Sequence, residues 1–507
     1  MRLLVFALAL LSAAYVAAPI DARAKHVERE AIRMAVATPA LTKGHPFGPY
    51  LGGSIPAALY DGLTQLTLSG RLMPAIASAW KAVDETAWQF EIRGDVRLQD
   101  GRLITTEMIV AEIDYLLRPE NRHFWVAEQL KTIVSARMLA PRQMLISTRV
   151  PDPLLPQKLS LLRVIDLSEW HARGDLDFAE HPNGSGPYRV LRWGPNATRI
   201  QLEPVPHAWR AVKGMRPVEI RVLPDATRRG QSLLSGEVDL ATNLDPDMIP
   251  VLQAQGLQHL QLPNPIWIVM AYRNGGAKNP LADVRVRQAL NHAVNKELIA
   301  NELLHLPHGT VPFPGTVLGF DAAEAGFQYD LARAKRLLSE AGYADGLRLR
   351  VAVWTGQAPG DSSIFQQVAA DLRKAGVTLD LVHIAFTEFS RRLDLGEWGP
   401  DIDAISRTWS SRMLMDPLPA LEAYSCNVQR KPIFCDAVFD KAVERLRYVM
   451  SPDVRETAIR AGMEAVLARA PALFIAPYSD VVGMSHSISG YSVRSDGVEL
   501  EKLMFVP

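Results

Sequence analysis

Segments with helical and with strand character alternate along the whole of this chain, and no repeat, low-complexity tract or long linker separates them. The runs at 32–36 and 351–354 are rich in apolar and β-branched residues, which is typical of strands. LARAKRLLSEAG at 331–342 has apolar residues at helical spacing and ends near a glycine, a common helix stop. The segment 285–304 predicts a longer amphipathic helix that begins after Asp283. This alternation predicts a mixed α/β fold.

The length and the charge balance limit the architecture and the partners. The chain has 507 residues, of which 48% are hydrophobic, and single hydrophobic cores stop growing near about 250–300 residues. We therefore expect two or three packed domains. The 55 basic side chains are balanced by 55 acidic ones, so the chain lacks the global basic field that a nucleic acid or an anionic membrane would attract. A local basic patch remains open.

The N-terminus has the order of residues found in a secretory signal peptide. Arg2 precedes an apolar run to Val16, and small residues follow up to Ala24, so we expect cleavage before Lys25. The apolar run is shorter than the roughly 20 residues that a membrane span needs; an uncleaved membrane anchor is the alternative. No cysteine for lipid attachment lies near the cleavage point. We therefore predict an exported, soluble protein without a lipid anchor, which an outer barrier retains in a periplasm.

The only cysteines are Cys426 and Cys435, nine positions apart. In an oxidising compartment two such thiols close a small disulfide loop, which stabilises the fold by about 2–3 kcal/mol in the chain-entropy model. Metal binding by two thiols without a nearby histidine is the less favoured alternative. We predict the disulfide.

A search for catalytic and cofactor motifs finds none that is complete. Gly483 to Ser487 lacks the last glycine of a nucleophile elbow. His305 and His308 flank a proline without thiols or carboxylates beside them, which favours a loop over a zinc site. GSGPY at 184–188 is not followed by the lysine of a phosphate loop, and we interpret its glycines and proline as a tight backbone turn. We predict no catalytic residue, metal or cofactor, and no enzymatic activity.

Five blocks of the sequence, taken in order, resemble the family 5 solute-binding proteins of ABC importers, which include peptide, dipeptide and nickel binders. The blocks that carry the resemblance are the region from LYDGLTQL to ITTEMIV at 59–110, HPNGSGPYRV at 181–190, LPDATRRGQSLLSGEVDLAT at 223–242, LADVRVRQALNHAVNKELI at 281–299 and AKRLLSEAGYADG at 334–346. Together they cover nearly the whole mature chain. Five ordered blocks are more specific than any one of them.

The resemblance implies a two-lobed, hinged periplasmic binding protein of type II, with an extra subdomain in its first lobe. We expect a signal peptide at 1–24, lobe I from 25–55, 178–270 and 484–507, the extra subdomain at 56–177, and lobe II at 271–483. Hinge closure would hold a ligand between the lobes, and the closed form would be recognised by a membrane permease. The implied partners are a small or peptide-like ligand and an ABC permease. We expect a monomer.

A loop of the second lobe distinguishes this chain from the peptide binders that it resembles. In that family a Trp lines the pocket, and an acidic residue three positions on pairs with the free amine of the ligand. Here Arg412 stands three positions after Trp409, and Asp416 comes later. A second guanidinium, Arg407, replaces a residue that is commonly small.

These substitutions suggest a ligand of a different charge. Like charges about 4 Å apart repel by several kcal/mol at an effective dielectric near 20, which disfavours a peptide amine at this place. Arginine instead suits a carboxylate or phosphate, and tryptophan stacks on flat groups. Our hypothesis is a ligand with an anionic or strongly polar end. The alternative is that Arg412 points to solvent or pairs with Asp403 or Asp416.

Four further residues are weaker candidates for ligand contact, each with core packing as an equal alternative: Asn243, Tyr50, Trp267 and Tyr272. We thus predict a periplasmic solute-binding protein that delivers a polar or anionic small molecule or modified peptide to an ABC permease. The alternatives are a sensing or scavenging protein of the same fold without a permease, and an ordinary oligopeptide binder. A secreted hydrolase is disfavoured by the motif search.

Overall fold

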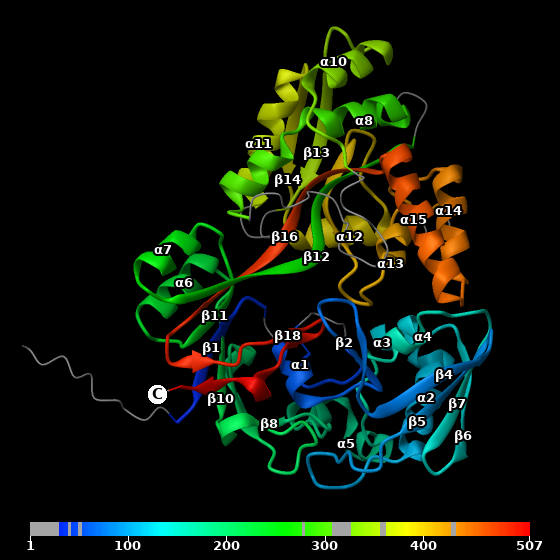
Figure 1. Ribbon diagram of the computed structural model, residues 1–507, viewed down its shortest axis with the longest axis vertical. Coiled ribbons are helices and arrows are strands. Elements are labelled where there is room, and N and C mark those ends of the chain that lie inside the picture. The colour runs from blue at the N-terminus through cyan, green and yellow to red at the C-terminus, as the bar shows by residue number, and fades with distance from the viewer. Residues whose placement is uncertain are drawn as a thin grey trace, which may run out of the picture. The chain divides into compact units, whose positions relative to one another are not determined.

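A ten-stranded mixed sheet organises the fold (Figure 1). The computed structural model describes residues 30–38, 42–48, 53–275, 279–306, 326–354, 361–426 and 432–506. In spatial order the strands are β14 (Val377–His383), β13 (Leu347–Val353), β15 (Ala404–Ser410), β12 (Gln258–Tyr272), β16 (Ala472–Met484), β11 (Leu240–Leu244), β1 (Ile32–Val36), β10 (Val218–Val222), β9 (Arg199–Pro204) and β8 (Tyr188–Trp193). The predicted strands at 32–36 and 351–354 are confirmed as β1 and the end of β13.

The two longest strands, β12 and β16, connect the two halves of this sheet. They pair antiparallel from Gln258 opposite Met484 to Ala271 opposite Ala472, and their register shifts between Pro263 and Trp267. Before the shift β16 also pairs with β11, and after it β12 also pairs with β15. The sheet is therefore continuous through a single two-stranded ribbon.

Smaller sheets and the helices complete the chain. A four-stranded sheet has the order β4 (Ala77–Asp84), β5 (Ala87–Ile92), β7 (Gln143–Thr148) and β6 (Ile133–Ala140), all within the predicted extra subdomain. Two-stranded sheets pair β2 (Thr64–Leu66) with β3 (Leu72–Pro74), β17 (Ile488–Ser489) with β20 (Met504–Phe505), and β18 (Val493–Arg494) with β19 (Gly497–Val498). The domain boundaries given above stay a prediction.

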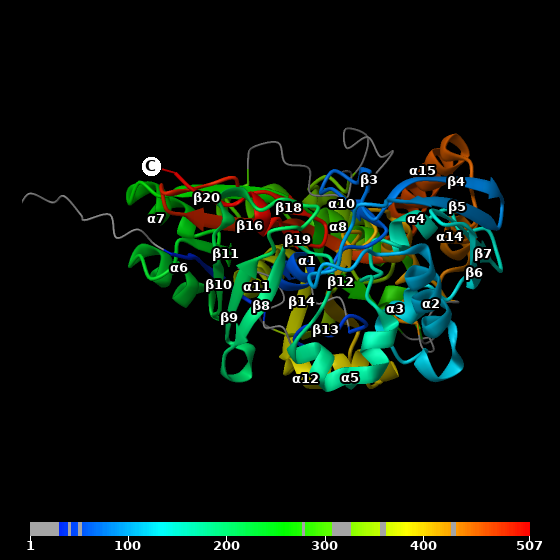
Figure 2. The same cartoon turned by 90° about the horizontal axis from the view of Figure 1, so that it is seen from below.

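The helices of the first part of the chain are α1 (Ser54–Leu59), α2 (Thr106–Leu117), α3 (Trp125–Gln129), α4 (Leu155–Lys158), α5 (Leu167–Glu180), α6 (Ala226–Leu234) and α7 (Met248–Ala254). Helices α6 and α7 lie beside β11 in both views (Figures 1 and 2). The later helices are α8 (Val284–Ala293), α9 (Lys296–Leu298), α10 (Leu331–Glu340), α11 (Asp361–Lys374), α12 (Phe386–Leu395), α13 (Leu418–Glu422), α14 (Ala437–Arg447) and α15 (Pro452–Arg469). None of the helices in the described part of the chain combines the length and apolar composition of a membrane span.

The single long helix predicted at 285–304 is wrong, although its start is correct. Asp283 caps α8 by accepting a hydrogen bond from the backbone N–H of Arg285. The helix ends at Ala293 because Val294 has extended dihedral angles, and Asn295 then caps the short helix α9. A π-helical turn follows at Ile299–Leu303. The side-chain oxygen of asparagine accepts hydrogen bonds from nearby backbone N–H groups. Asparagine therefore favours the start of a new helix over continuation of the old one.

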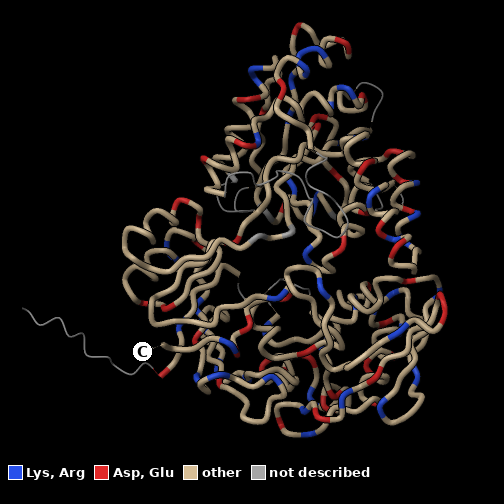
Figure 3. Tube along the Cα trace, in the orientation of Figure 1, with Lys and Arg blue, Asp and Glu red and all other residues tan. Residues whose placement is uncertain are grey.

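Side chains alternate between two cores on the faces of the sheet in its β14–β12 half. Along β12, Ile268, Met270 and Tyr272 belong to one core, whereas Trp267, Val269 and Ala271 belong to the other. This is the period of two expected for a strand that is buried on both faces. Acidic and basic residues are interspersed along the trace (Figure 3).

The GSGPY turn is built around close backbone contacts. A Cβ on Gly184 would lie 2.2 Å from the carbonyl oxygen of Leu59, and one on Gly186 would lie 2.2 Å from that of Ala58. Both distances are far below van der Waals contact, so only glycine fits. Between the glycines, the Ser185 hydroxyl donates to the buried carboxylate of Asp61 at 2.9 Å. The turn therefore ties the start of β8 to the end of α1.

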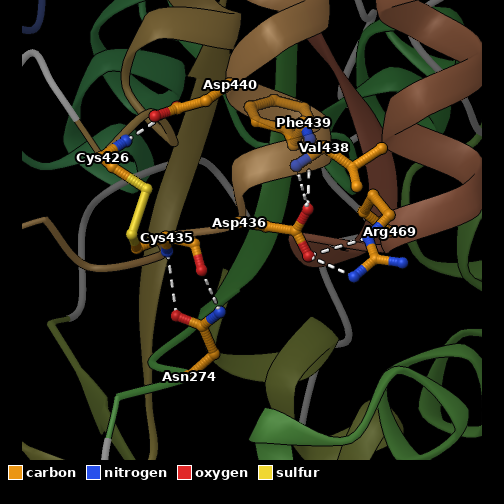
Figure 4. The surroundings of a disulfide bond; sticks show 8 residues. All are labelled: Asn274, Cys426, Cys435, Asp436, Val438, Phe439, Asp440 and Arg469. Carbon is orange, nitrogen blue, oxygen red and sulfur yellow. Dashed lines mark hydrogen bonds and ion pairs between the residues drawn. A yellow bond between two sulfur atoms is a disulfide. The ribbon is translucent and has the colours of Figure 1, made fainter.

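The predicted disulfide between Cys426 and Cys435 is confirmed (Figure 4). Its surroundings are ordered by side chains from other elements. The Cys426 N–H donates to Asp440 of α14, and the backbone of Cys435 exchanges two hydrogen bonds with Asn274, which follows β12. The crosslink thus fixes a loop at both of its ends.

Removal of the disulfide is expected to destabilise the protein moderately. A loop closed over nine positions loses about 2–3 kcal/mol of stabilisation when it is opened, in the chain-entropy model. The double variant Cys426→Ser/Cys435→Ser should unfold at a lower urea concentration than the oxidised protein. Reducing agent should have no further effect on this variant. An unchanged midpoint would show that the loop is already constrained without the crosslink.

Candidate functional site

A cavity of about 180 Å³ lies among the ends of strands from the β11 half of the sheet. Its wall comes from residues that follow β1, from the start of α1, from β11 and β16, and from the β18–β19 hairpin. The polar members of the lining are Thr38, Ser54, Thr242, Asn243, Arg412, Asp480 and Tyr491. Regions far apart in the chain, among them Ile220 of β10 and Arg412, therefore converge on one polar hollow.

Asp480 is the centre of the polar wall. Its Oδ1 atom accepts a hydrogen bond from Asn243 Nδ2 at 2.7 Å, and its Oδ2 atom accepts from Asn264 Nδ2 at 3.0 Å and from Arg412 Nη1 at 3.2 Å. Arg412 Nε also donates to the backbone oxygen of Ser495 at 3.2 Å. The carboxylate thus balances the guanidinium of Arg412.

The ion pair between Arg412 and Asp480 is of the weaker kind. Only one guanidinium nitrogen, Arg412 Nη1, donates to Asp480. Arg33, by contrast, donates to the buried Asp239 through both Nε at 3.0 Å and Nη2 at 2.9 Å. Two-pronged pairs are both stronger and more fixed in direction. Arg412 therefore keeps guanidinium donors that can turn toward a ligand.

Asn243 is held in a conformation that few residues adopt. Its φ of 52° lies in the left-handed region, at the point where the pairing of β11 with β16 is irregular. Asparagine tolerates this region better than most residues. The conformation places the side-chain amide within reach of both Asp480 and the Tyr478 hydroxyl.

Two tyrosines beside the carboxylate stay protonated. Burial, and secondarily the charge of Asp480, raises the pKa of Tyr478 and of Tyr491 well above the ordinary value. Both hydroxyls are therefore hydrogen-bond donors at any physiological pH. Among the described residues, the wall offers a ligand one carboxylate, one guanidinium, the Asn243 amide and neutral hydroxyls.

A second cluster of predicted residues lies on β12 and β15, outside this lining. Trp409 faces Trp267 across the two strands and stacks on Tyr424, with 5.1 Å between ring centroids. Only 1% of Trp409 is exposed, and it belongs to the same core as Leu154 and Leu161. Arg407 lies over the Tyr424 ring at 5.8 Å.

The structure separates the residues that the sequence analysis grouped together. Arg412 and Asn243 line the cavity, whereas Trp409, Trp267 and Arg407 form the second cluster. Tyr272 points to the opposite face of the sheet and donates to the Arg287 carbonyl oxygen at 3.4 Å. Tyr50 lies outside the described residues. That any of these residues contacts a ligand stays a prediction.

The alternative partners considered for Arg412 are wrong. Asp403 accepts from the Arg350 backbone at 2.8 Å, and Asp416 pairs with Arg455 at 2.7 Å. The sequence analysis missed Asp480, although a charged residue within the apolar strand ALFIAPYSDVVGM is a recognisable signal. Among the described residues, no group of three His, Cys, Asp or Glu side chains is arranged to hold a metal ion.

Comparison with known proteins shows the class of this one. The chain is 25% identical over 377 residues to the nickel-binding periplasmic protein of Escherichia coli, which covers 70% of each sequence. It is 25% identical over 478 residues to a dipeptide-binding protein of Pseudomonas aeruginosa, covering 86% of this chain and 87% of the relative. The crystal structure of NikZ from Campylobacter jejuni in complex with Ni(L-His) superposes with a TM-score of 0.77 at 19% identity, over 94% of this chain and 99% of that one.

The structural likeness confirms the predicted fold class, the two-lobed α/β fold of periplasmic binding proteins. The model of the bacterial extracellular solute-binding proteins, family 5, matches residues 71–430. The chain therefore belongs to this family and is a solute-binding protein. Members of the family are binding proteins rather than enzymes, and the family is extracytoplasmic.

Proposed function

We propose that this protein captures a polar small molecule or modified peptide in the periplasm and delivers it to an ABC permease of the inner membrane. The family and the importers that its members serve support the transport role. The signal-peptide-like N-terminus supports export.

The observation that carries the proposal is the polar wall of the cavity. Arg412, Asp480 and Asn243 all reach the same hollow, and the pair Arg412–Asp480 is held by one hydrogen bond. Small-molecule sites commonly combine a concave surface with a few polar groups that fix the orientation of the ligand. A polar solute can exchange hydrogen bonds with both members of the pair.

The ligand should be retained by protein purified from its own host and be identified by native mass spectrometry. We expect the variant Arg412→Gln to bind the retained solute at least about tenfold more weakly, because one charge-assisted hydrogen bond contributes about 1.5–3 kcal/mol. Isothermal titration calorimetry measures this change.

Arg348→Gln is the matched control. Arg348 pairs with Asp380 at the exposed surface of the β14 edge, so affinity should be unchanged. Equal affinities of the wild type and of Arg412→Gln would show that the solute does not bind at this cavity wall. Absence of any retained or titratable solute would contradict the capture function itself.

A further inference from the structure

Three buried polar groups of the β12–β15 cluster lack hydrogen-bond partners. Trp267 and Tyr424 are 2% and 1% exposed. Within the ranges that the structure describes, neither Trp267 Nε1, the Tyr424 hydroxyl nor Arg407 Nη1 has a partner. A buried donor that makes no hydrogen bond is costly and therefore rare in native proteins.

Arg407 also differs from Arg412 in having no counterion among the described residues. The aspartates on either side of it in the chain are engaged elsewhere, Asp403 with the Arg350 backbone and Asp416 with Arg455. Arg412, by contrast, has Asp480. In the described part of the chain Arg407 takes part in no ion pair. Its guanidinium instead makes a cation–π contact with the Tyr424 ring.

The strand register brings the three groups together. Arg407 is opposite Val269 and Trp409 is opposite Trp267, so Arg407 and Trp267 are diagonal neighbours on one face of the sheet. Diagonal neighbours on paired strands are separated by about 7–8 Å. Tyr424 contacts both arms of this arrangement. Its ring stacks on Trp409, and the Arg407 guanidinium lies over the same ring.

The chemistry of the cluster is one-sided. The indole N–H and the guanidinium only donate hydrogen bonds. Burial raises the pKa of Tyr424 to about 12, so its hydroxyl is protonated as well. The surrounding residues are apolar, among them Val269, Ile405 and Phe474, and a charge-assisted hydrogen bond is stronger in such an environment. Three donors, one of them charged, complement an oxyanion.

We infer that Arg407, Trp267 and Tyr424 form a subsite for an oxyanion, a carboxylate or a phosphate, of the transported solute. The inference rests on the proposed capture function. It assigns the acidic end of the ligand to Arg407 and leaves the cavity beside Arg412 and Asp480 for other polar groups. The solute is then an organic acid or a phosphorylated compound.

Tyr424→Phe is the decisive variant. If the hydroxyl belongs to a binding site, its loss should weaken binding without lowering the Tm. Removing a hydroxyl without a partner leaves the Tm of the free protein unchanged or raises it. The same change weakens oxyanion binding about tenfold, the effect of one hydrogen bond of about 1.4 kcal/mol. Tyr188→Phe is the matched control. Its hydroxyl donates to the backbone oxygens of Arg216 and Leu500 at 3.3 Å, away from the β12–β15 cluster, so this variant should lower the Tm and leave binding unchanged.

The probes are sodium acetate and sodium phosphate, with sodium chloride at equal ionic strength as reference. In protein labelled with ¹⁵N-tryptophan, the indole resonance of Trp267, assigned through Trp267→Phe, should shift with saturation on addition of acetate or of phosphate. The probe that binds identifies the source of the oxyanion. Arg407→Gln should abolish the shift, and Arg348→Gln, at the exposed surface, should preserve it.

Three outcomes would overturn the inference. They are the absence of a saturating shift with both probes, an equal shift in Tyr424→Phe and wild type, and a Tm loss in Tyr424→Phe as large as in Tyr188→Phe. Any of these in a protein that still retains its solute by native mass spectrometry contradicts the subsite alone. A saturating shift in a protein that retains no solute supports the subsite and contradicts the capture function.

Discussion

Replacing Gly186 by alanine is expected to destabilise the protein by about 3 kcal/mol or more, the upper range for overpacking a buried position. The added Cβ would lie 2.2 Å from the Ala58 carbonyl oxygen and 2.5 Å from the Leu59 carbonyl carbon. These are backbone atoms at the end of α1, so no rotation of a side chain relieves the overlap. The Gly186 N–H also donates to the Leu59 carbonyl oxygen at 3.0 Å, and moving the chains apart would weaken this bond.

Urea unfolding followed by far-UV circular dichroism measures the loss. Gly275→Ala is the matched control, since a Cβ there has no atom of the described residues within 4 Å and the backbone is not left-handed. Its midpoint should stay close to that of the wild type. Equal midpoints for the two variants would mean that the contact between the GSGPY turn and α1 relaxes at little cost.

Asp61→Ala is expected to cost about 3–5 kcal/mol, the typical effect of breaking a buried ion pair from one side. The Asp61 side chain is 2% exposed. It accepts hydrogen bonds from Arg210 Nε at 2.8 Å, from Trp209 Nε1 at 2.8 Å and from the Ser185 hydroxyl at 2.9 Å. The substitution leaves the donors of Arg210, Trp209 and Ser185 without this acceptor, although Arg210 keeps its contact with Glu501.

The same unfolding measurement applies, with Asp380→Ala as control. Asp380 pairs with Arg348, whose side chain is exposed, and surface pairs contribute little. The control should therefore unfold close to the wild type. A similar midpoint for Asp61→Ala would mean that water replaces the carboxylate without loss of structure.

Interactions between residues close in the chain were predictable from the sequence, and the long-range ones were not. The disulfide spans nine positions, and the cap at Asp283 is local, so both could be read directly. The end of α8 at Ala293 was missed because the apolar spacing continues past it, while the extended dihedral angles of Val294 interrupt the helix. Periodicity alone does not show such a break.

The candidate site was predicted in its composition but not in its arrangement. Arg412 and Asn243 were expected at a binding surface, and both line the cavity. The counterion of Arg412 is Asp480, 68 positions away, whereas the sequence analysis considered only Asp403 and Asp416, its neighbours in the chain. Trp409 is buried because Tyr424 stacks on it. The alternation of residues along a strand does not predict which distant side chain will cover a given residue.

The irregularity in the β12–β16 ribbon has a mechanical consequence. Hydrogen bonding between the strands is regular from Gln258 to Pro263 and resumes at Trp267, so torsion of one half of the sheet against the other disrupts the fewest backbone bonds at 263–267. Asn264 lies within this interval and donates to Asp480. We expect a solute that draws Arg412 away from that carboxylate to change the forces on this interval of the ribbon, and so to couple filling of the cavity to bending of the sheet.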